Sequence, residues 1–195
     1  MKLILASESP YRRQLLDRLQ LPYLAQAHRV DERVYESELP SDITLPERAV
    51  SLAIAKARSL ASDHDGAFII ASDQIAEMDG TVLHKPGTAT NAIAQLEMLQ
   101  GQTHRLLTAV ALHGPDGDTK SALDQHKMVM RSLTPEEIRR YVHLEKPLDC
   151  CGSYKIESLG ISLFDAIVGD DFTAITGLPL LALSRLLREA GFTIP

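Results

Sequence analysis

The sequence predicts an α/β fold in which helices flank a mixed β-sheet, and three observations support this prediction. Short apolar runs typical of buried strands alternate with segments whose apolar residues recur at helical spacing. Two long extended runs, separated by Gly-Pro-Asp-Gly at 114–117, indicate a β-hairpin, which a purely parallel sheet does not contain. The length of 195 residues fits one domain, 1–195, which we expect to have two lobes around a cleft.

In the first part of the chain, the expected apolar strands alternate along the sequence with two expected helices. Ser7-Glu8-Ser9-Pro10 indicates a helix start, because serine caps a helix and proline suits its first position. Asp31 opens a polar stretch without an apolar stripe, which predicts a mobile loop. The expected elements are a strand over 2–6, a helix over 11–20, an extended segment over 23–28, the loop over 31–41, a helix over 46–62 and a strand over 67–71.

In the second part, turn and capping signals set the boundaries. Asp79-Gly80 predicts a hairpin turn, and Thr134-Pro135-Glu136-Glu137 predicts a capping box at a helix start. The expected elements are strands over 75–78 and 81–83, a helix over 90–99, the long hairpin over 103–131, a helix over 134–144, a strand over 161–164 and a helix over 179–190.

Composition and charge exclude several classes of function. Twenty Lys and Arg against 26 Asp and Glu give a net charge of −6, which disfavours binding to a nucleic-acid polymer. The only cysteines, Cys150 and Cys151, are adjacent and cannot form a disulfide framework, so we expect a protein of the reducing cytosol. The apolar run at the N-terminus is too short for a signal peptide or a membrane span, and we expect no membrane partner.

An anion site is indicated where the first strand meets the first helix. Ser7, Arg12 and Arg13 lie there, beside the unpaired N–H groups and positive dipole end of the helix. Arginine suits a phosphate because its planar donors engage two oxygens at once. The alternative is that both arginines decorate an exposed helix, since the loop lacks the glycines of a P-loop.

A carboxylate site is indicated at the end of the strand over 67–71. Asp73 follows four apolar residues, at a place where α/β sheets present catalytic groups, and it could bind a metal or activate water. Asp31-Glu32 could supply a second carboxylate, and Lys56 and Lys85 could add positive charge for a magnesium-bound polyphosphate. The alternative is a turn-forming aspartate satisfied by backbone amides.

Six motifs in order resemble the Maf family of nucleotide pyrophosphatases, across nearly the whole chain. They are LILASxSPxRRxLL at 3–16, VDE at 30–32, AxAxxKAxSLA at 53–61, SDQ at 72–74, KP at 85–86 and TGLPLxAL at 176–183. The resemblance implies an elongated Maf/ITPase-like mixed sheet with a cleft, a homodimer, and cleavage of nucleoside triphosphates to monophosphate and pyrophosphate with a divalent metal such as Mg²⁺ or Mn²⁺.

The resemblance also implies roles for individual residues. Asp73 matches the proton acceptor and, with Glu32, a metal-associated position. The positions that match phosphate-binding residues of the family are Ser7, Arg12, Arg13, Lys56 and Lys85.

Three further positions resemble the branch of the family that hydrolyses 7-methyl-GTP. Tyr11 could stack on the positively charged methylated base, Gln74 offers a donor and an acceptor, and the carboxylate of Glu157 could accept from the guanine edge. Departures from the usual pattern fall at Tyr11 itself and at His84, Ile156 and Ser158. The alternatives are a dTTP/UTP pyrophosphatase of the same family and a non-hydrolytic nucleotide-sensing regulator of cell division.

Overall fold

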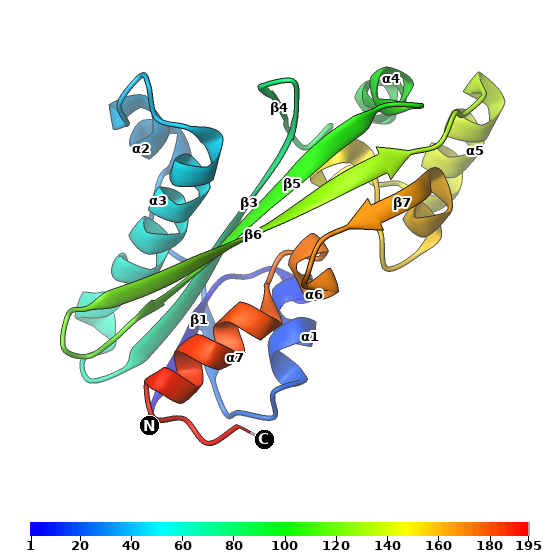
Figure 1. Cartoon of the computed structure of the whole chain (residues 1–195). Helices are drawn as coiled ribbons and strands as arrows, with labels where there is room; N and C mark the ends of the chain where they lie inside the picture. The colour runs from blue at the N-terminus through cyan, green and yellow to red at the C-terminus, as the bar shows by residue number, and fades with distance from the viewer. Residues whose placement is uncertain (195) are drawn as a thin grey trace. The chain divides into compact units, whose positions relative to one another are not determined.

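The structure is a computed structural model that describes residues 1–194, and these residues form seven strands and seven α-helices. Figure 1 follows the path of the chain through them. The strands are β1 Leu3–Ala6, β2 Leu24–Gln26, β3 Phe68–Met78, β4 Thr81–Leu83, β5 Thr103–His113, β6 Thr119–Met130 and β7 Phe164–Val168. The helices are α1 Pro10–Asp17, α2 Glu32–Glu38, α3 Leu45–Arg58, α4 Ala89–Leu99, α5 Pro135–Glu145, α6 Phe172–Ile175 and α7 Leu180–Glu189. Short 3₁₀ turns cover Ala61–Asp63, Cys151–Ser153 and Leu159–Leu163.

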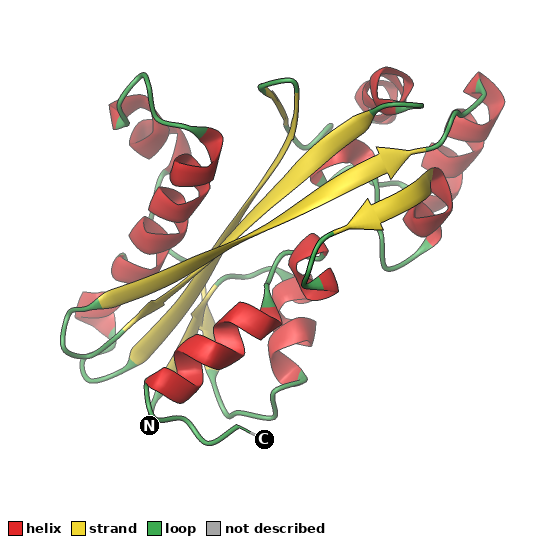
Figure 2. Cartoon of the chain, in the orientation of Figure 1, coloured by secondary structure: helices red, strands yellow, loops and turns green. Residues whose placement is uncertain are grey.

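The strands form one mixed sheet in the order β2-β1-β3-β5-β6-β7, with β4 paired to β3. β1 pairs in parallel with both β2 and β3, whereas β3 pairs with β4, and β6 with β7, in antiparallel fashion. Figure 2 shows the strands and helices that alternate along the chain. The predicted α/β fold with a mixed sheet is therefore confirmed.

By internal contacts the described chain divides into two compact units. Unit 1 comprises residues 1–74, 107–124 and 171–194, and unit 2 comprises 75–106 and 125–170. In unit 1, Leu3 and Leu5 of β1 belong to a hydrophobic cluster with the apolar faces of α1 and α7. Because side chains alternate along a strand, Ile4 is buried on the other face of the sheet. In unit 2, the core includes buried Leu96, Ile138 and Tyr154.

Two expectations from the sequence were wrong, and both concern elements without a buried face. The segment after Asp31 is the helix α2, not a loop; the Asp31 side chain caps it by accepting from the N–H groups of Arg33 and Val34. No residue of α2 is buried, so the helix lacks the apolar stripe that a periodicity test requires. The last strand, β7, begins at Phe164 instead of Ile161, and none of its residues is fully buried.

The short helix α6 was also missed. Asp171 caps it by accepting from Thr173 N–H, but a helix of a single turn gives no periodic signal. Among residues 1–194, no helix combines the length and the apolar character needed to cross a membrane.

Candidate active site

The centre of the site is Lys56, on the last turn of α3. The neighbouring apolar residues Leu52, Ala53 and Ala57 bury this helix face, and they carry Lys56 into the interior, where it is only 3% exposed. Its ammonium group donates to Asp73 Oδ1 at 2.6 Å and lies 2.9 Å from Glu32 Oε1. A buried ammonium needs such partners, because its desolvation is otherwise costly.

Asp73 does not follow the end of a strand, as the sequence predicted, because β3 runs without a break from Phe68 to Met78 and carries Asp73 in its interior. This strand lies in the middle of the sheet. The residue is 6% exposed, so its carboxylate sits in a largely dry environment and is matched in charge by Lys56. Ser72, the residue before it, donates its hydroxyl hydrogen to the carbonyls of Ala109 and Gly177 at 2.7 and 2.8 Å. The strand around Asp73 is thereby held rigidly.

Glu32 is the more exposed carboxylate of the cluster. Partial burial disfavours its ionised form, but the charge of Lys56 and its hydrogen bond, with smaller contributions from His28 and Arg12, outweigh burial and lower the pKa of Glu32. Glu32 is therefore an ionised carboxylate at neutral pH, at the first turn of α2.

His28 belongs to the same cluster, although it was not predicted from the sequence. Its Nε2 atom lies 3.6 Å from Glu32 Oε1, and its Nδ1 atom is buried without a hydrogen-bond partner. Burial and then Lys56 lower the pKa of His28, so the imidazole is neutral at pH 7, with its hydrogen best placed on Nε2 facing Glu32. The spacing of four residues between His28 and Glu32 was the only sequence signal.

The start of α1 holds the predicted anion-binding residues. Ser9 caps the helix by accepting from Arg12 N–H, and buried Ser7 accepts from Ser9 N–H at 3.1 Å. The Arg12 side chain donates from Nε to the carbonyl of Gly177 at 2.9 Å. Its positive charge acts on Glu32 and His28, so Arg12 reaches the electrostatic field of the Lys56 cluster.

Arg13 lies elsewhere on the same helix. Its side chain is exposed, and its charge acts on the hydroxyl of Tyr23, which also bonds Asp17 at 2.8 Å. The structure thus brings Glu32, Lys56 and Asp73 together, and the charge of Arg12 acts on Glu32, whereas the charge of Arg13 acts on Tyr23.

Gln74 and Tyr11 are the unit 1 residues expected to recognise the base. The Gln74 amide nitrogen donates to Thr108 Oγ1 and to the carbonyls of Ala174 and Ile175 at 2.9–3.0 Å. Since carbonyls only accept, this contact set fixes the amide orientation, and the amide oxygen is the atom left to face a base. Tyr11 is half-buried in the first turn of α1.

Lys85 and Glu157 lie in unit 2, each exposed on a braced loop. The Lys85 loop is fixed by Gln95, which donates to the carbonyl of His84 at 3.1 Å. The Glu157 loop is fixed by Glu145, which accepts from the hydroxyl of Ser158 at 2.7 Å. The departure from the family pattern at Ser158 therefore provides an anchor for the loop.

The donor set limits the kind of metal that the site could hold. Among residues 1–194, no three His, Cys, Asp or Glu side chains are close enough together to cage an ion. Glu32 and Asp73 supply two carboxylates that share the Lys56 ammonium. Mg²⁺ is commonly bound by one or two carboxylates together with waters and substrate phosphates, so these residues fit an ion that arrives with a polyphosphate.

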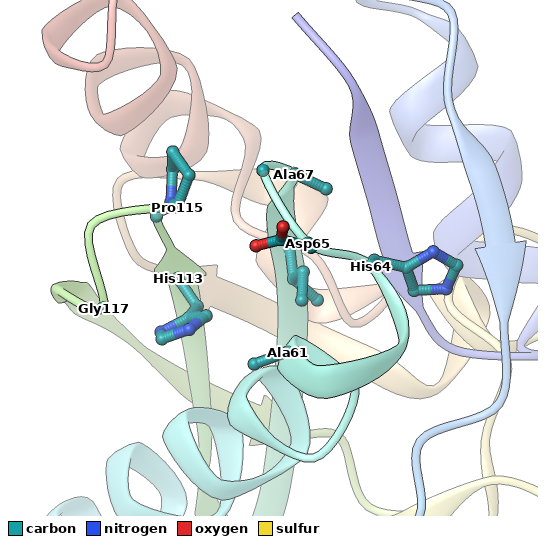
Figure 3. Close-up of a pocket in the computed structure, with 10 residues that line it drawn as sticks. Ala61, His64, Asp65, Ala67, His113, Pro115 and Gly117 are labelled. Carbon is teal, nitrogen blue, oxygen red and sulfur yellow. The ribbon is translucent and has the colours of Figure 1, made fainter.

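An open pocket of about 230 Å³ also lies in unit 1, between the 3₁₀ turn at Ala61–Asp63 and the β5–β6 turn (Figure 3). His64, Asp65 and His113 line it, and the ring of His64 bonds the Gln26 side chain at 2.8 Å. None of the predicted site residues lines this pocket, so it is separate from the Lys56 cluster.

The structure thus combines a mixed α/β sheet with a buried lysine that two carboxylates share. The chain belongs to the Maf-like protein family, whose model matches residues 2–190. A 7-methyl-GTP pyrophosphatase of Xanthomonas oryzae pv. oryzae is 52% identical over 100% of this chain and 99% of its own length. A 7-methyl-GTP pyrophosphatase of Aromatoleum aromaticum is 46% identical over 100% of this chain and 98% of its own length.

Two solved structures resemble the chain more distantly. The Staphylococcus aureus Ham1 protein matches with a TM-score of 0.48 and 15% identity over 98% of both chains. A nucleoside-triphosphatase / dITP/XTP pyrophosphatase from Mycobacterium abscessus matches with a TM-score of 0.43 and 20% identity over 67% of this chain and 74% of its own.

Proposed function

We propose that this protein is a nucleoside triphosphate pyrophosphatase that hydrolyses 7-methyl-GTP to 7-methyl-GMP and pyrophosphate and so removes a modified nucleotide. Full-length relatives at 46–52% identity that carry the name 7-methyl-GTP pyrophosphatase support the reaction and the substrate. The observation that carries the proposal is the buried Asp73 carboxylate, 2.6 Å from the Lys56 ammonium and beside Glu32.

The chemistry follows from the two oxygens of Asp73. Oδ1 accepts from Lys56, which fixes the carboxylate plane and leaves Oδ2 to take a proton from water. The water oxygen forms a bond to a phosphorus of the triphosphate as a phosphoanhydride bond breaks, and pyrophosphate leaves with the bonding electrons. Lys56 and Arg12, with Arg13 and Lys85, neutralise the phosphate charge during this step, and the hydroxyl of Ser7 donates a hydrogen bond to a phosphate oxygen.

A divalent ion, Mg²⁺ or Mn²⁺, is part of the proposal. Bound between the phosphates and Glu32 and Asp73, it would supply charge neutralisation and polarise the reacting phosphoryl oxygen. Glu32 suits this task because its lowered pKa keeps it ionised at neutral pH.

Recognition of the base is assigned to Tyr11, Gln74 and Glu157. The positively charged ring of 7-methylguanine favours an aromatic face such as that of Tyr11. The Glu157 carboxylate can accept from the two donors on the guanine edge, and the Gln74 oxygen can accept from a further donor or a bridging water. Thymine and uracil lack this pair of donors, which separates the proposal from a dTTP/UTP pyrophosphatase.

We also place the protein in the cytoplasm, as a homodimer. Cys150 and Cys151 are free thiols, and burial raises the pKa of Cys150 to about 12, so it is an unreactive thiol at neutral pH.

Light scattering of the purified protein tests the proposed homodimer, and a monomer at micromolar concentration would exclude it.

The testing experiment measures pyrophosphate release from 7-methyl-GTP, GTP, dTTP, UTP and CTP with Mg²⁺ or Mn²⁺, with an Asp73→Asn protein beside the wild type. The proposal expects the highest kcat/KM for 7-methyl-GTP and loss of turnover in the variant. Preference for dTTP and UTP would favour the other branch of the family. Tight nucleotide binding without any turnover would favour the sensing regulator instead.

A further inference from the structure

The segment from Asp171 to Leu181, which contains the TGLPL motif, supplies no side chain to the function proposed above, yet hydrogen bonds hold its backbone at several points. The Asp171 carboxylate accepts from Thr173 N–H and from Leu181 N–H at 3.0 and 2.7 Å. Thr173 Oγ1 in turn accepts from Leu180 N–H at 2.8 Å. These bonds fix the path of the backbone on both sides of Gly177.

The carbonyl of Gly177 joins this loop to two other elements. It accepts from Arg12 Nε at 2.9 Å and from Ser72 Oγ at 2.8 Å. Ser72 is completely buried, and the same hydroxyl reaches the carbonyl of Ala109 on β5 at 2.7 Å. The position of the Gly177 oxygen is therefore set by the sheet, and Arg12 binds to a fixed point.

The hydrogen bond from Arg12 to the Gly177 carbonyl is donated by the Nε atom of the guanidinium group. Arginine has one Nε–H and two terminal NH₂ groups in a rigid plane, so a bond from Nε fixes the direction of the plane and of both terminal groups. Gly177 has a φ of +106°, a backbone conformation that residues with a side chain rarely adopt. The glycine thus permits the turn that presents its carbonyl to Arg12.

We propose that the Gly177 carbonyl, anchored by Ser72, is a positioning group that orients the Arg12 guanidinium so that its terminal nitrogens grip a phosphate of the substrate. The inference rests on the proposed function, because it assumes a polyphosphate ligand. Arg12 reaches the electrostatic field of Glu32 and His28, so the oriented group acts at the Lys56 cluster. A preorganised arginine loses less freedom on binding than a mobile one.

The competing explanation is purely structural: the bond would only fasten the C-terminal part of the chain to α1. The two explanations differ in what removal of the Ser72 hydroxyl does. A fastening role costs stability alone, whereas a positioning role also weakens the binding of a phosphate ligand.

The experiment compares Ser72→Ala with Thr108→Val, a matched control. Thr108 Oγ1 donates to the same segment, at the carbonyl of Ala174 instead of that of Gly177. Binding of inorganic pyrophosphate in Mg²⁺ buffer is measured by calorimetry, together with kcat and KM and the melting temperature. We expect similar melting temperatures for the two variants, and about tenfold weaker pyrophosphate binding for Ser72→Ala only. Because Thr108 also bonds Gln74, the control applies to pyrophosphate binding, and a raised KM is expected for Ser72→Ala. Equal affinities in the two variants would overturn the inference.

A double-mutant cycle with Arg12→Ala gives the sharper result. If Ser72 acts through Arg12, Ser72→Ala has no further effect on pyrophosphate affinity once Arg12 is alanine; fully additive effects would contradict the inference.

Should Ser72→Ala not fold, Arg12→Lys serves instead, since it keeps the charge but loses the Nε donor. We expect it to bind pyrophosphate as weakly as Arg12→Ala, and wild-type affinity would overturn the inference. Failure of the proposed function shows separately, as wild-type protein that binds pyrophosphate but releases none from 7-methyl-GTP.

Discussion

Lys56 holds Asp73 by a 2.6 Å hydrogen bond in the interior of unit 1, and each of the two residues is less than a tenth exposed. Removing a charge pair from water is costly, and loss of one member leaves an uncompensated buried charge. Here the bond fixes one carboxylate oxygen and leaves the other for chemistry. The same contact therefore links the stability of unit 1 to the proposed reaction.

The Lys56→Met substitution is expected to destabilise the protein by about 3 kcal/mol, because it leaves the buried carboxylate of Asp73 without its counter-charge. Urea denaturation at pH 7 measures the loss. Adding Asp73→Asn should recover part of the stability, since a neutral amide replaces the uncompensated charge. A single variant within about 0.5 kcal/mol of the wild type would show that the pair is not buried as described.

The Asp73→Asn substitution is expected to lower kcat for pyrophosphate release by roughly 10²–10⁴-fold, the range associated with loss of a general base. The shape of the side chain is kept, so KM should change little. Asp65→Asn, in the separate pocket, is the matched control and should retain full turnover. Comparable turnover in the two variants would remove Asp73 from the proposed role.

Stability should fall as the pH drops from 6.5 toward 4, because of His104. Burial, only partly opposed by Glu77, lowers the pKa of His104 to about 4, so the unfolded chain binds its proton more tightly than the folded protein does. The contribution of His104 to the free energy of unfolding is fully present above pH 6.5. The free energy lost through this residue reaches on the order of 3 kcal/mol near pH 4.

Thermal or urea unfolding between pH 4 and 7 checks this expectation with the His104→Gln variant, which can still bond the Tyr154 hydroxyl and should have a flatter pH profile. His143→Gln, at an exposed position, should keep the wild-type profile. A His104→Gln profile as steep as that of the wild type would assign the pH dependence to other groups.

The Glu157→Gln substitution should reduce the preference for 7-methyl-GTP over UTP, measured as the ratio of their kcat/KM values, by about tenfold to a hundredfold. This range corresponds to the free energy that hydrogen bonds to a charged acceptor contribute. The turnover of UTP should change little. Glu136→Gln, exposed on α5 and paired with Arg139, is the control. An unchanged preference in the Glu157 variant would place recognition of the base elsewhere.

The sequence predicted those elements that carry their own local signal. The capping box of Thr134 and Glu137 appears as expected at the start of α5, and Asp79-Gly80 turns β3 into β4. The helices with apolar stripes were found to within a few residues, although α3 ends at Arg58, earlier than the expected Ser62. The elements that were missed, α2, α6 and most of β7, bury little apolar surface and so left no pattern in the sequence.

For the site, the sequence determined the residue types and their order: a serine and arginines at the first helix, two carboxylates, and lysines. Only the tertiary structure decided which of them meet. Lys56 and Asp73 are 17 positions apart, and Arg12 and Gly177 are 165 apart, distances over which periodicity and capping carry no information. Helix and strand signals are local because backbone hydrogen bonds and side-chain alternation are local. The pairing of charges depends instead on how the sheet and its helices pack around a common core.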